Sequence, residues 1–198
     1  MGYSKQAFVG VSWMGAFRLI SRIVAIGRSI LLARVLTPAQ FGVFGIASII
    51  LSFLEILTET GVNIFLIQEK EDIDKFVSSA WIVSILRGTL ICLAIITTAP
   101  FIVNFFNMQD LYRFLYLISL VPLIRGFINP SIVKYQKNLK FKKDFWLRIS
   151  IYLFDSATSV ILALTLSDAI GFVWGLIAGA ILEVILSFIF FKPWPLLK

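Results

Sequence analysis

Three arginines lie within the apolar stretch FVGVSWMGAFRLISRIVAIGRSILL (residues 8–32): Arg18, Arg22 and Arg28. The stretch is long enough to cross a bilayer, because about 20 helical residues span the hydrocarbon core. A charged side chain at the bilayer centre costs roughly 2.5–3.5 kcal/mol on insertion scales, so such residues usually face a bundle interior or a water-filled cavity. The stretch therefore predicts a membrane helix beside a cationic cavity, which would favour an anionic substrate.

Five further apolar blocks follow the first. Hydrophobic residues make up 59% of the 198 residues and charged residues only 15%, whereas soluble domains are about half apolar and a quarter charged. The six blocks, delimited by charge clusters and turn signals, are residues 8–32, 41–67, 76–103, 111–133, 145–167 and 170–191. Each can cross a bilayer. The fold class that we predict is therefore an all-α integral membrane protein, a single bundle of six transmembrane helices over residues 1–198.

The lysines are distributed unevenly about these blocks. All ten lie before the first block, between the second and third, between the fourth and fifth, or after the sixth. The other side carries Arg34, Asp110 and Asp168, with Arg113 at a helix edge. Because Lys and Arg next to spans are retained in the cytoplasm, we expect both termini to be cytoplasmic. The basic stretch 134–143 is then expected to contact anionic membrane lipids, and nucleic acid is not an expected partner.

Each block carries one stripe of small, polar or charged residues. Arg18 and Arg22 fall on one helix face with Arg28 at its flank, and Glu55 and Glu59 share a face of the second block. The intramembrane charges are five arginines (Arg18, Arg22, Arg28, Arg87 and Arg125) and four acids (Glu55, Glu59, Asp155 and Glu183). Two interpretations stay open. The charges form internal ion pairs, or they line an aqueous cavity in which substrate replaces some pairs.

Several reactive groups are missing from the chain. There is no histidine and a single cysteine, Cys92, within the third block. This excludes histidine acid–base chemistry, histidine metal sites and disulfides. No phosphate-binding loop of the G-x-x-x-x-G-K-[ST] type is present. We therefore expect a protein that is not an enzyme and holds neither a metal nor a cofactor. Glu55 and Glu59 are candidates for ion pairing, or for coupling to a proton or cation.

Three motifs at the ends of the blocks resemble one family. The chain reads LLARVLTPAQFGVFGIASII over 31–50, ETGVNIFLIQEKE over 59–71 and VKYQKNLKFKK over 133–143. Their turn, helix end and basic loop, with six predicted spans, are similar to the N-terminal part of the polysaccharide-transport flippases. These proteins serve lipopolysaccharide, O-antigen or exopolysaccharide synthesis within the multidrug/oligosaccharidyl-lipid/polysaccharide exporter superfamily.

The resemblance implies a transport function. Such flippases move a polyprenyl-pyrophosphate-linked oligosaccharide to the outer leaflet of a bacterial or archaeal cytoplasmic membrane by alternating access. The lipid-linked oligosaccharide is then the expected partner, and no residue is catalytic because no covalent bond changes. The resemblance makes the five arginines candidates for contacting the pyrophosphate. Arginine suits this role because its planar fork binds phosphate in two places.

The chain departs from the family in size. The family fold has two lobes around a central cavity, and six spans correspond to one lobe. We consider three interpretations: the N-terminal half of a longer protein, an inactive remnant, or a half-transporter that pairs with a second copy. Two other functions stay open. A multidrug or cation antiporter of the same fold predicts a net acidic cavity, and a non-transporting scaffold subunit would tolerate loss of both Arg18 and Arg22.

Overall fold

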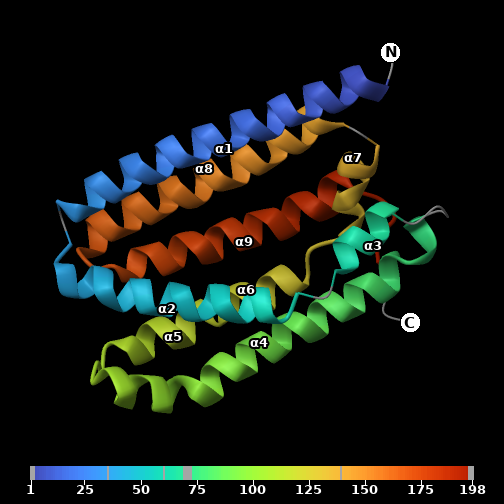
Figure 1. The fold of residues 1–198 in the computed structure, drawn as a ribbon. Helices are drawn as coiled ribbons and strands as arrows, with labels where there is room; N and C mark the ends of the chain where they lie inside the picture. Colours follow the sequence, from blue (N-terminus) through green and yellow to red (C-terminus); the bar gives the residue numbers. More distant parts are fainter. Residues whose placement is uncertain (1–2, 35, 60, 69–72, 139, 196–198) are drawn as a thin grey trace.

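The chain folds into a bundle of helices in the computed structural model, which describes residues 3–34, 36–59, 61–68, 73–138 and 140–195 (Figure 1). No strand occurs among these residues. The elements are α1 (Tyr3–Ala33), α2 (Pro38–Leu57), α3 (Val62–Gln68), η1 (Ile73–Lys75), α4 (Val77–Phe106), α5 (Leu111–Ile118), α6 (Leu120–Gly126), η2 (Pro130–Val133), α7 (Lys134–Lys137), α8 (Phe141–Leu166) and α9 (Ile170–Phe190). Two of the ten lysines from which the orientation is predicted, Lys70 and Lys198, lie outside the described residues.

Four helices are long and apolar enough to cross a membrane: α2, α4, α8 and α9, of 20, 30, 26 and 21 residues. A fifth candidate is the pair Leu111–Gly126 and Pro130–Lys137, which is bent by 70°. The helix α1 has 31 residues and carries Arg18, Arg22 and Arg28, but it is not among these candidates. The structure therefore supports a multi-pass membrane protein with four or five spans, and six spans stay a prediction.

The helices form two groups that meet along α9 (Figure 1). In one group α8 packs against both α1 and α9, and in the other α4 packs against α5 and α6. Contacts of α5 and α6 with α9 join the groups, and α2 lies against α5. This arrangement places one face of α2, α4, α6, α8 and α9 toward the middle of the bundle.

The turn before α2 is built by the motif Thr-Pro-Ala-Gln. The hydroxyl of Thr37 accepts a hydrogen bond from the Gln40 backbone at 3.3 Å, and the Gln40 side chain accepts one from the Thr37 backbone at 2.9 Å. This capping box, with Pro38 in the first turn, starts the helix. The Gln40 amide also donates to the carbonyl of Ser167 at 3.3 Å. The motif therefore fixes α2 to the turn between α8 and α9.

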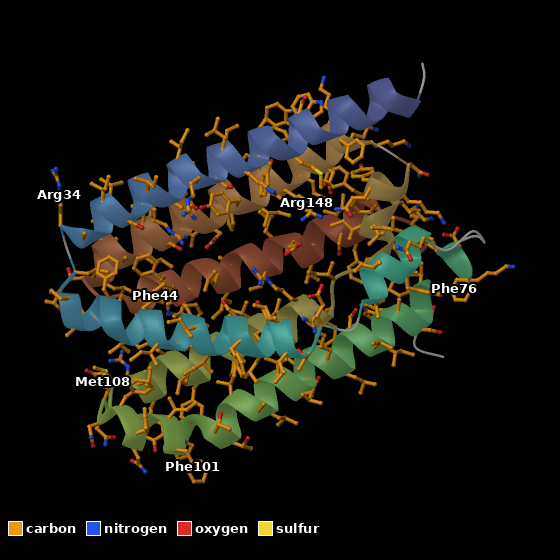
Figure 2. All side chains as sticks on the ribbon, in the orientation of Figure 1. Arg34, Phe44, Phe76, Phe101, Met108 and Arg148 are labelled. Atoms are coloured by element: carbon orange, nitrogen blue, oxygen red, sulfur yellow. The ribbon has the colours of Figure 1, made fainter. Side chains whose placement is uncertain are left out.

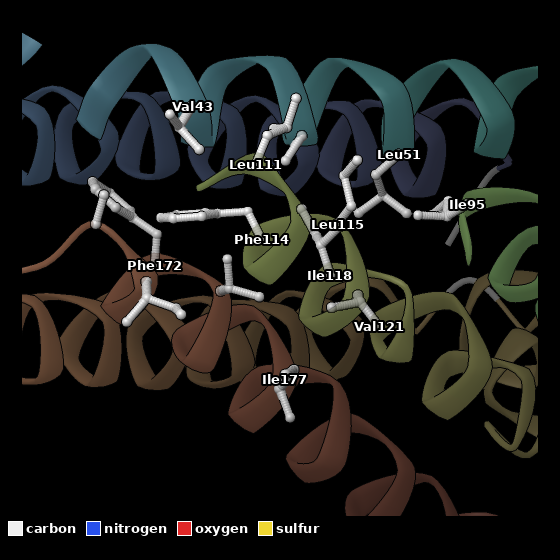
Figure 3. Packing of buried hydrophobic residues seen from close by; sticks show 14 of the residues in the cluster. Val43, Leu51, Ile95, Leu111, Phe114, Leu115, Ile118, Val121, Phe172 and Ile177 are labelled. Carbon is white, nitrogen blue, oxygen red and sulfur yellow. The ribbon is translucent and has the colours of Figure 1, made fainter. Parts of the chain in front are cut away.

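Apolar side chains from α2, α4, α5, α6 and α9 make one core (Figure 3). Leu115, Ile118 and Val121 are fully buried, and Leu51 and Ile95 pack beside them. Nearer the Thr37 turn, the ring of Phe44 stacks on that of Phe172 at 4.5 Å between centroids, and Phe41 meets the same ring edge-on. The core therefore lies toward the end of the bundle away from α3 and α7.

The second apolar block is not one continuous helix. Residues 41–67 are divided between α2, which ends at Leu57, and the short α3, which begins at Val62. Gly61 between them has φ +65°, a left-handed conformation that glycine adopts without steric cost. The expectation of a single span over 41–67 is therefore corrected. Its polar stripe continues along α2 only as far as Glu55, and Glu59 lies beyond the helix.

The fourth apolar block is also broken. The helix α5 ends at Ile118 and α6 begins at Leu120. Pro122 has no backbone N–H to donate to the carbonyl of Ile118, which accounts for a break at this point. After Gly126 the chain turns again, and Pro130 starts η2 with Asn129 as its N-cap. The expectation of one straight span over 111–133 is therefore corrected, because the block is bent where its two prolines lie.

Close packing of α4 and α6 depends on Gly88. A Cβ atom at Gly88 would collide with the carbonyl oxygen of Pro122, whereas one at Gly42 on α2 would meet nothing within 4 Å. We expect Gly88→Ala to destabilise the protein by about 1–3 kcal/mol because the two helices must move apart. The matched change Gly42→Ala should stabilise it by about 0.5–1 kcal/mol. Thermal unfolding in detergent checks both; equal effects of the two changes would contradict this packing.

Candidate functional site

Charged side chains from five helices line the largest cavity, which has a volume of about 470 Å³. They are Glu55 of α2, Arg87 of α4, Arg125 of α6, Arg148 of α8 and Glu183 of α9. Figure 2 shows side chains extending between the two helix groups, with Arg148 labelled on α8. The lining thus holds three arginines and two carboxylates, and a third carboxylate, Asp144, pairs with Arg148 from outside it.

Three smaller cavities adjoin the first, because they share lining residues with it. A cavity of about 410 Å³ shares Glu55 and Arg87, one of about 230 Å³ shares Arg148, and one of about 160 Å³ shares Arg125, Arg148 and Glu183. The four cavities are therefore neighbours within the bundle.

Arg125 joins two helices across the largest cavity. Its Nη1 lies 3.2 Å from Oε1 of Glu55, and the two side chains are 40% and 29% exposed. The Nε atom of Arg125 is buried and makes no hydrogen bond within the described ranges. One carboxylate therefore uses only part of the donor capacity of this guanidinium.

Arg87 caps the end of α2. Its Nη2 donates to the carbonyl oxygen of Glu55 at 2.6 Å, and its Nε donates to the hydroxyl of Thr58 at 3.3 Å. A cation at this position is favoured because the last carbonyls of a helix carry partial negative charge. Carbonyl oxygens are neutral acceptors, so the Arg87 charge stays available to the cavity.

Arg148 and Glu183 complete the lining from α8 and α9. The Nε of Arg148 donates to Oδ2 of Asp144 at 2.9 Å, one turn earlier on the same helix. Glu183 lines two of the cavities, and its carboxylate has no hydrogen bond or ion pair in the part of the chain that the structure describes. The sequence analysis did not include Arg148 or Asp144 among the candidate site residues. The Asp–x–x–x–Arg spacing, which places both side chains on one helix face, could have identified this ion pair from the sequence.

Arg28 and Asp155 make a separate contact between α1 and α8. Nη1 of Arg28 lies 3.7 Å from Oδ2 of Asp155, and the two side chains are 19% and 13% exposed. The Arg28 guanidinium also lies 5.5 Å from the centre of the Phe172 ring, a favourable cation–π distance. Ser159 donates to the other oxygen of Asp155 at 3.3 Å. This pair therefore holds α1 against α8 and α9.

A double-mutant cycle should reveal the Arg28–Asp155 coupling. We expect Asp155→Asn to destabilise the protein by about 1–3 kcal/mol, because it leaves a largely buried guanidinium without a counter-charge. The double change Arg28→Met with Asp155→Asn should cost less than the sum of these two single changes. Unfolding in detergent of the four proteins measures this, and strictly additive effects would show that the two residues do not interact.

The remaining three candidates lie apart from the largest cavity. Arg18 lines the cavity of about 230 Å³ between α1 and α8, and Glu59 lines the cavity of about 410 Å³ beside α3. Arg22 is exposed on α1 and lines none of these four cavities. The structure thus brings together Arg87, Arg125, Glu55 and Glu183, and places the other candidates around them.

Metal-binding side chains do not gather at this site. Across the described ranges, no group of three or more His, Cys, Asp or Glu residues lies close enough to hold a metal ion. Arginine side chains in a cavity between apolar helices attract anions, because arginine binds phosphate or carboxylate with two parallel hydrogen bonds.

These features define a multi-pass helical membrane protein with an arginine-lined cavity between its helices. The chain belongs to the family described as polysaccharide biosynthesis protein, because the model of that family matches residues 31–198. The resemblance seen in the sequence motifs is thereby confirmed at the level of the family.

One relative supports the same assignment. An "uncharacterized membrane protein in cps region" from Klebsiella pneumoniae is 24% identical over 190 residues, which cover 96% of this chain and 39% of the relative. The chain therefore spans about two fifths of the length of this relative. No solved structure matches the chain.

Proposed function

We propose that this chain is part of an exporter that moves a polyprenyl-pyrophosphate-linked oligosaccharide across the cytoplasmic membrane for surface polysaccharide synthesis. Membership of a polysaccharide biosynthesis family and the membrane-spanning helices support this proposal. The lysine distribution supports an orientation with both termini in the cytoplasm. In this proposal the chain supplies one lobe, and a second lobe or a second copy completes the path.

One observation carries the proposal: Arg87, Arg125 and Arg148 line a single cavity together with Glu55 and Glu183, and Asp144 beside the cavity pairs with Arg148. A pyrophosphate group presents several acceptor oxygens, and arginine forks bind them in pairs. Arg87 and Arg125 each have a partner that leaves part of the guanidinium unused. These groups can therefore hold a doubly charged headgroup inside the bilayer without a metal.

The Glu55–Arg125 pair offers a means of coupling binding to movement. It links α2 to α6 across the cavity, and both lie beside breaks in the helix path, at Gly61 and Asn129. Broken helices at membrane depth commonly line transport cavities. In our proposal, pyrophosphate binds Arg125 and breaks its ion pair with Glu55. The helix α2 is then free to shift against α6.

A cation antiporter is the second candidate, and Glu183 favours it. This carboxylate lines two cavities and has no ion pair among the residues described, so it could bind a proton or a metal cation. The three arginines that line the same cavity oppose cation entry. Coupling of export to a cation at Glu183 is compatible with both functions.

Deletion of the coding gene in its own host tests the proposal. Surface polysaccharide should disappear, while the lipid-linked oligosaccharide is still made and accumulates on the cytoplasmic side of the membrane. A chain that acts in synthesis instead would leave no lipid-linked oligosaccharide. Unchanged surface polysaccharide would contradict a role in export, provided that no second exporter is encoded.

A further inference from the structure

The cavity of about 230 Å³ between α1 and α8 differs from the others in its lining. Four aromatic residues make one wall (Trp13, Phe17, Phe141 and Phe145). The rings of Trp13 and Phe145 are in contact, with centroids 5.0 Å apart. Arg18, Gln136, Asp144 and Arg148 supply the polar part. An apolar wall beside two guanidinium groups fits a ligand that has both an apolar chain and an anionic group.

The two arginines of this cavity differ in their ion pairing. Arg148 is paired with Asp144 at 2.9 Å, which neutralises most of its charge. Arg18 is exposed, and its guanidinium makes no hydrogen bond or ion pair with any residue that the structure describes. The cavity therefore has one uncompensated positive charge, at Arg18.

The position of the cavity corresponds to the lipid headgroup level. On α8 it is lined by residues of the first two turns, Phe141 to Arg148, next to the exposed Lys142 and Lys143. Tryptophan, arginine and lysine gather where a bilayer meets water, and lysine clusters there attract anionic lipids.

We infer that this cavity binds the phosphate group of a membrane lipid, held by Arg18, with the first part of the lipid chain against the aromatic wall. The cavity has room for a headgroup and not for a whole lipid. A phospholipid and a polyprenyl phosphate share this chemistry. Because Gln136 and Arg148 also line the largest cavity, the lipid phosphate would lie directly beside it. The inference does not depend on the proposed transport function.

Native mass spectrometry of the purified protein tests this site. The detergent-solubilised protein is titrated separately with phosphatidylglycerol, with a polyprenyl monophosphate and with diacylglycerol, which lacks phosphate. We expect both phosphate lipids to bind and diacylglycerol not to bind. Arg18→Gln should weaken phosphate-lipid binding about tenfold, the loss expected for one charge-assisted hydrogen bond. Arg18→Lys, which keeps the charge, should retain most of the binding.

The control is Arg113→Gln, an exposed arginine of α5 that lies outside the cavity. It should change binding by less than about fivefold, as expected for an exposed charge. A preference for polyprenyl phosphate would identify the source as the carrier lipid, and equal or stronger binding of phosphatidylglycerol would identify a membrane phospholipid. Wild-type binding by Arg18→Gln, or an equal loss in Arg113→Gln, would overturn the inference. Unchanged thermal unfolding of the variants shows that they are folded.

Discussion

Replacing Arg125 with glutamine is expected to lower polysaccharide export about 100-fold, because the variant loses its charge-assisted hydrogen bonds to the pyrophosphate. Arg125 faces the largest cavity from α6 and contacts Glu55 with only part of its guanidinium. Export is measured as surface polysaccharide in cells that carry the variant as their only copy of the gene. Arg113→Gln, an exposed arginine on α5, is the control and should export normally.

The double variant with Glu55→Gln and Arg125→Gln separates two roles of Arg125. If the arginine only neutralises Glu55, removing both charges should restore export. If it contacts the pyrophosphate, the double variant should stay as inactive as the single one. Membrane levels of each protein are measured in parallel, so that loss of export is not confused with loss of the protein.

Replacing Asn129 with alanine is expected to destabilise the protein by about 3–5 kcal/mol, because three hydrogen bonds are lost at a buried position. The Asn129 side chain is fully buried. Its amide nitrogen donates to the carbonyls of Phe191 and Pro193 at 3.2 and 3.3 Å, and its oxygen accepts from the Ser131 backbone at 3.0 Å. These bonds fasten the bent fourth block to the end of α9.

Asn104→Ala provides the comparison for Asn129. Asn104 is exposed near the end of α4, and its replacement should change stability by less than about 0.5 kcal/mol. Unfolding in detergent is followed by circular dichroism for both variants. Similar stabilities for the two would mean that the Asn129 hydrogen bonds do not hold the fourth block and α9 together.

The sequence pattern predicts where helices lie better than where they break. The blocks 76–103, 145–167 and 170–191 correspond closely to α4, α8 and α9. A long apolar stretch between charge clusters is stable in a bilayer as a spanning helix. Breaks depend on single residues. Gly61 ends the second block early, and its effect could not be distinguished from that of a glycine packed within a helix, such as Gly88.

The candidate site was predictable in composition but not in arrangement. Intramembrane charge identified Arg87, Arg125, Glu55 and Glu183, which line one cavity. Which cavity a residue faces depends on how each helix is rotated about its axis. Arg148 faces the cavity because of how α8 is rotated. Close packing on α9 sets this rotation, since a Cβ at Gly175 would collide with Ser159 of α8. That contact between distant residues is not visible in one sequence.

The proposed pyrophosphate site is tested most directly by measuring the affinity of the purified protein for a polyprenyl pyrophosphate. We predict that the wild-type protein binds this lipid and that Arg125→Gln binds it at least about tenfold more weakly, with Arg113→Gln unchanged. Equal affinity of the wild-type protein and Arg125→Gln would contradict a pyrophosphate site among Arg87, Arg125 and Arg148.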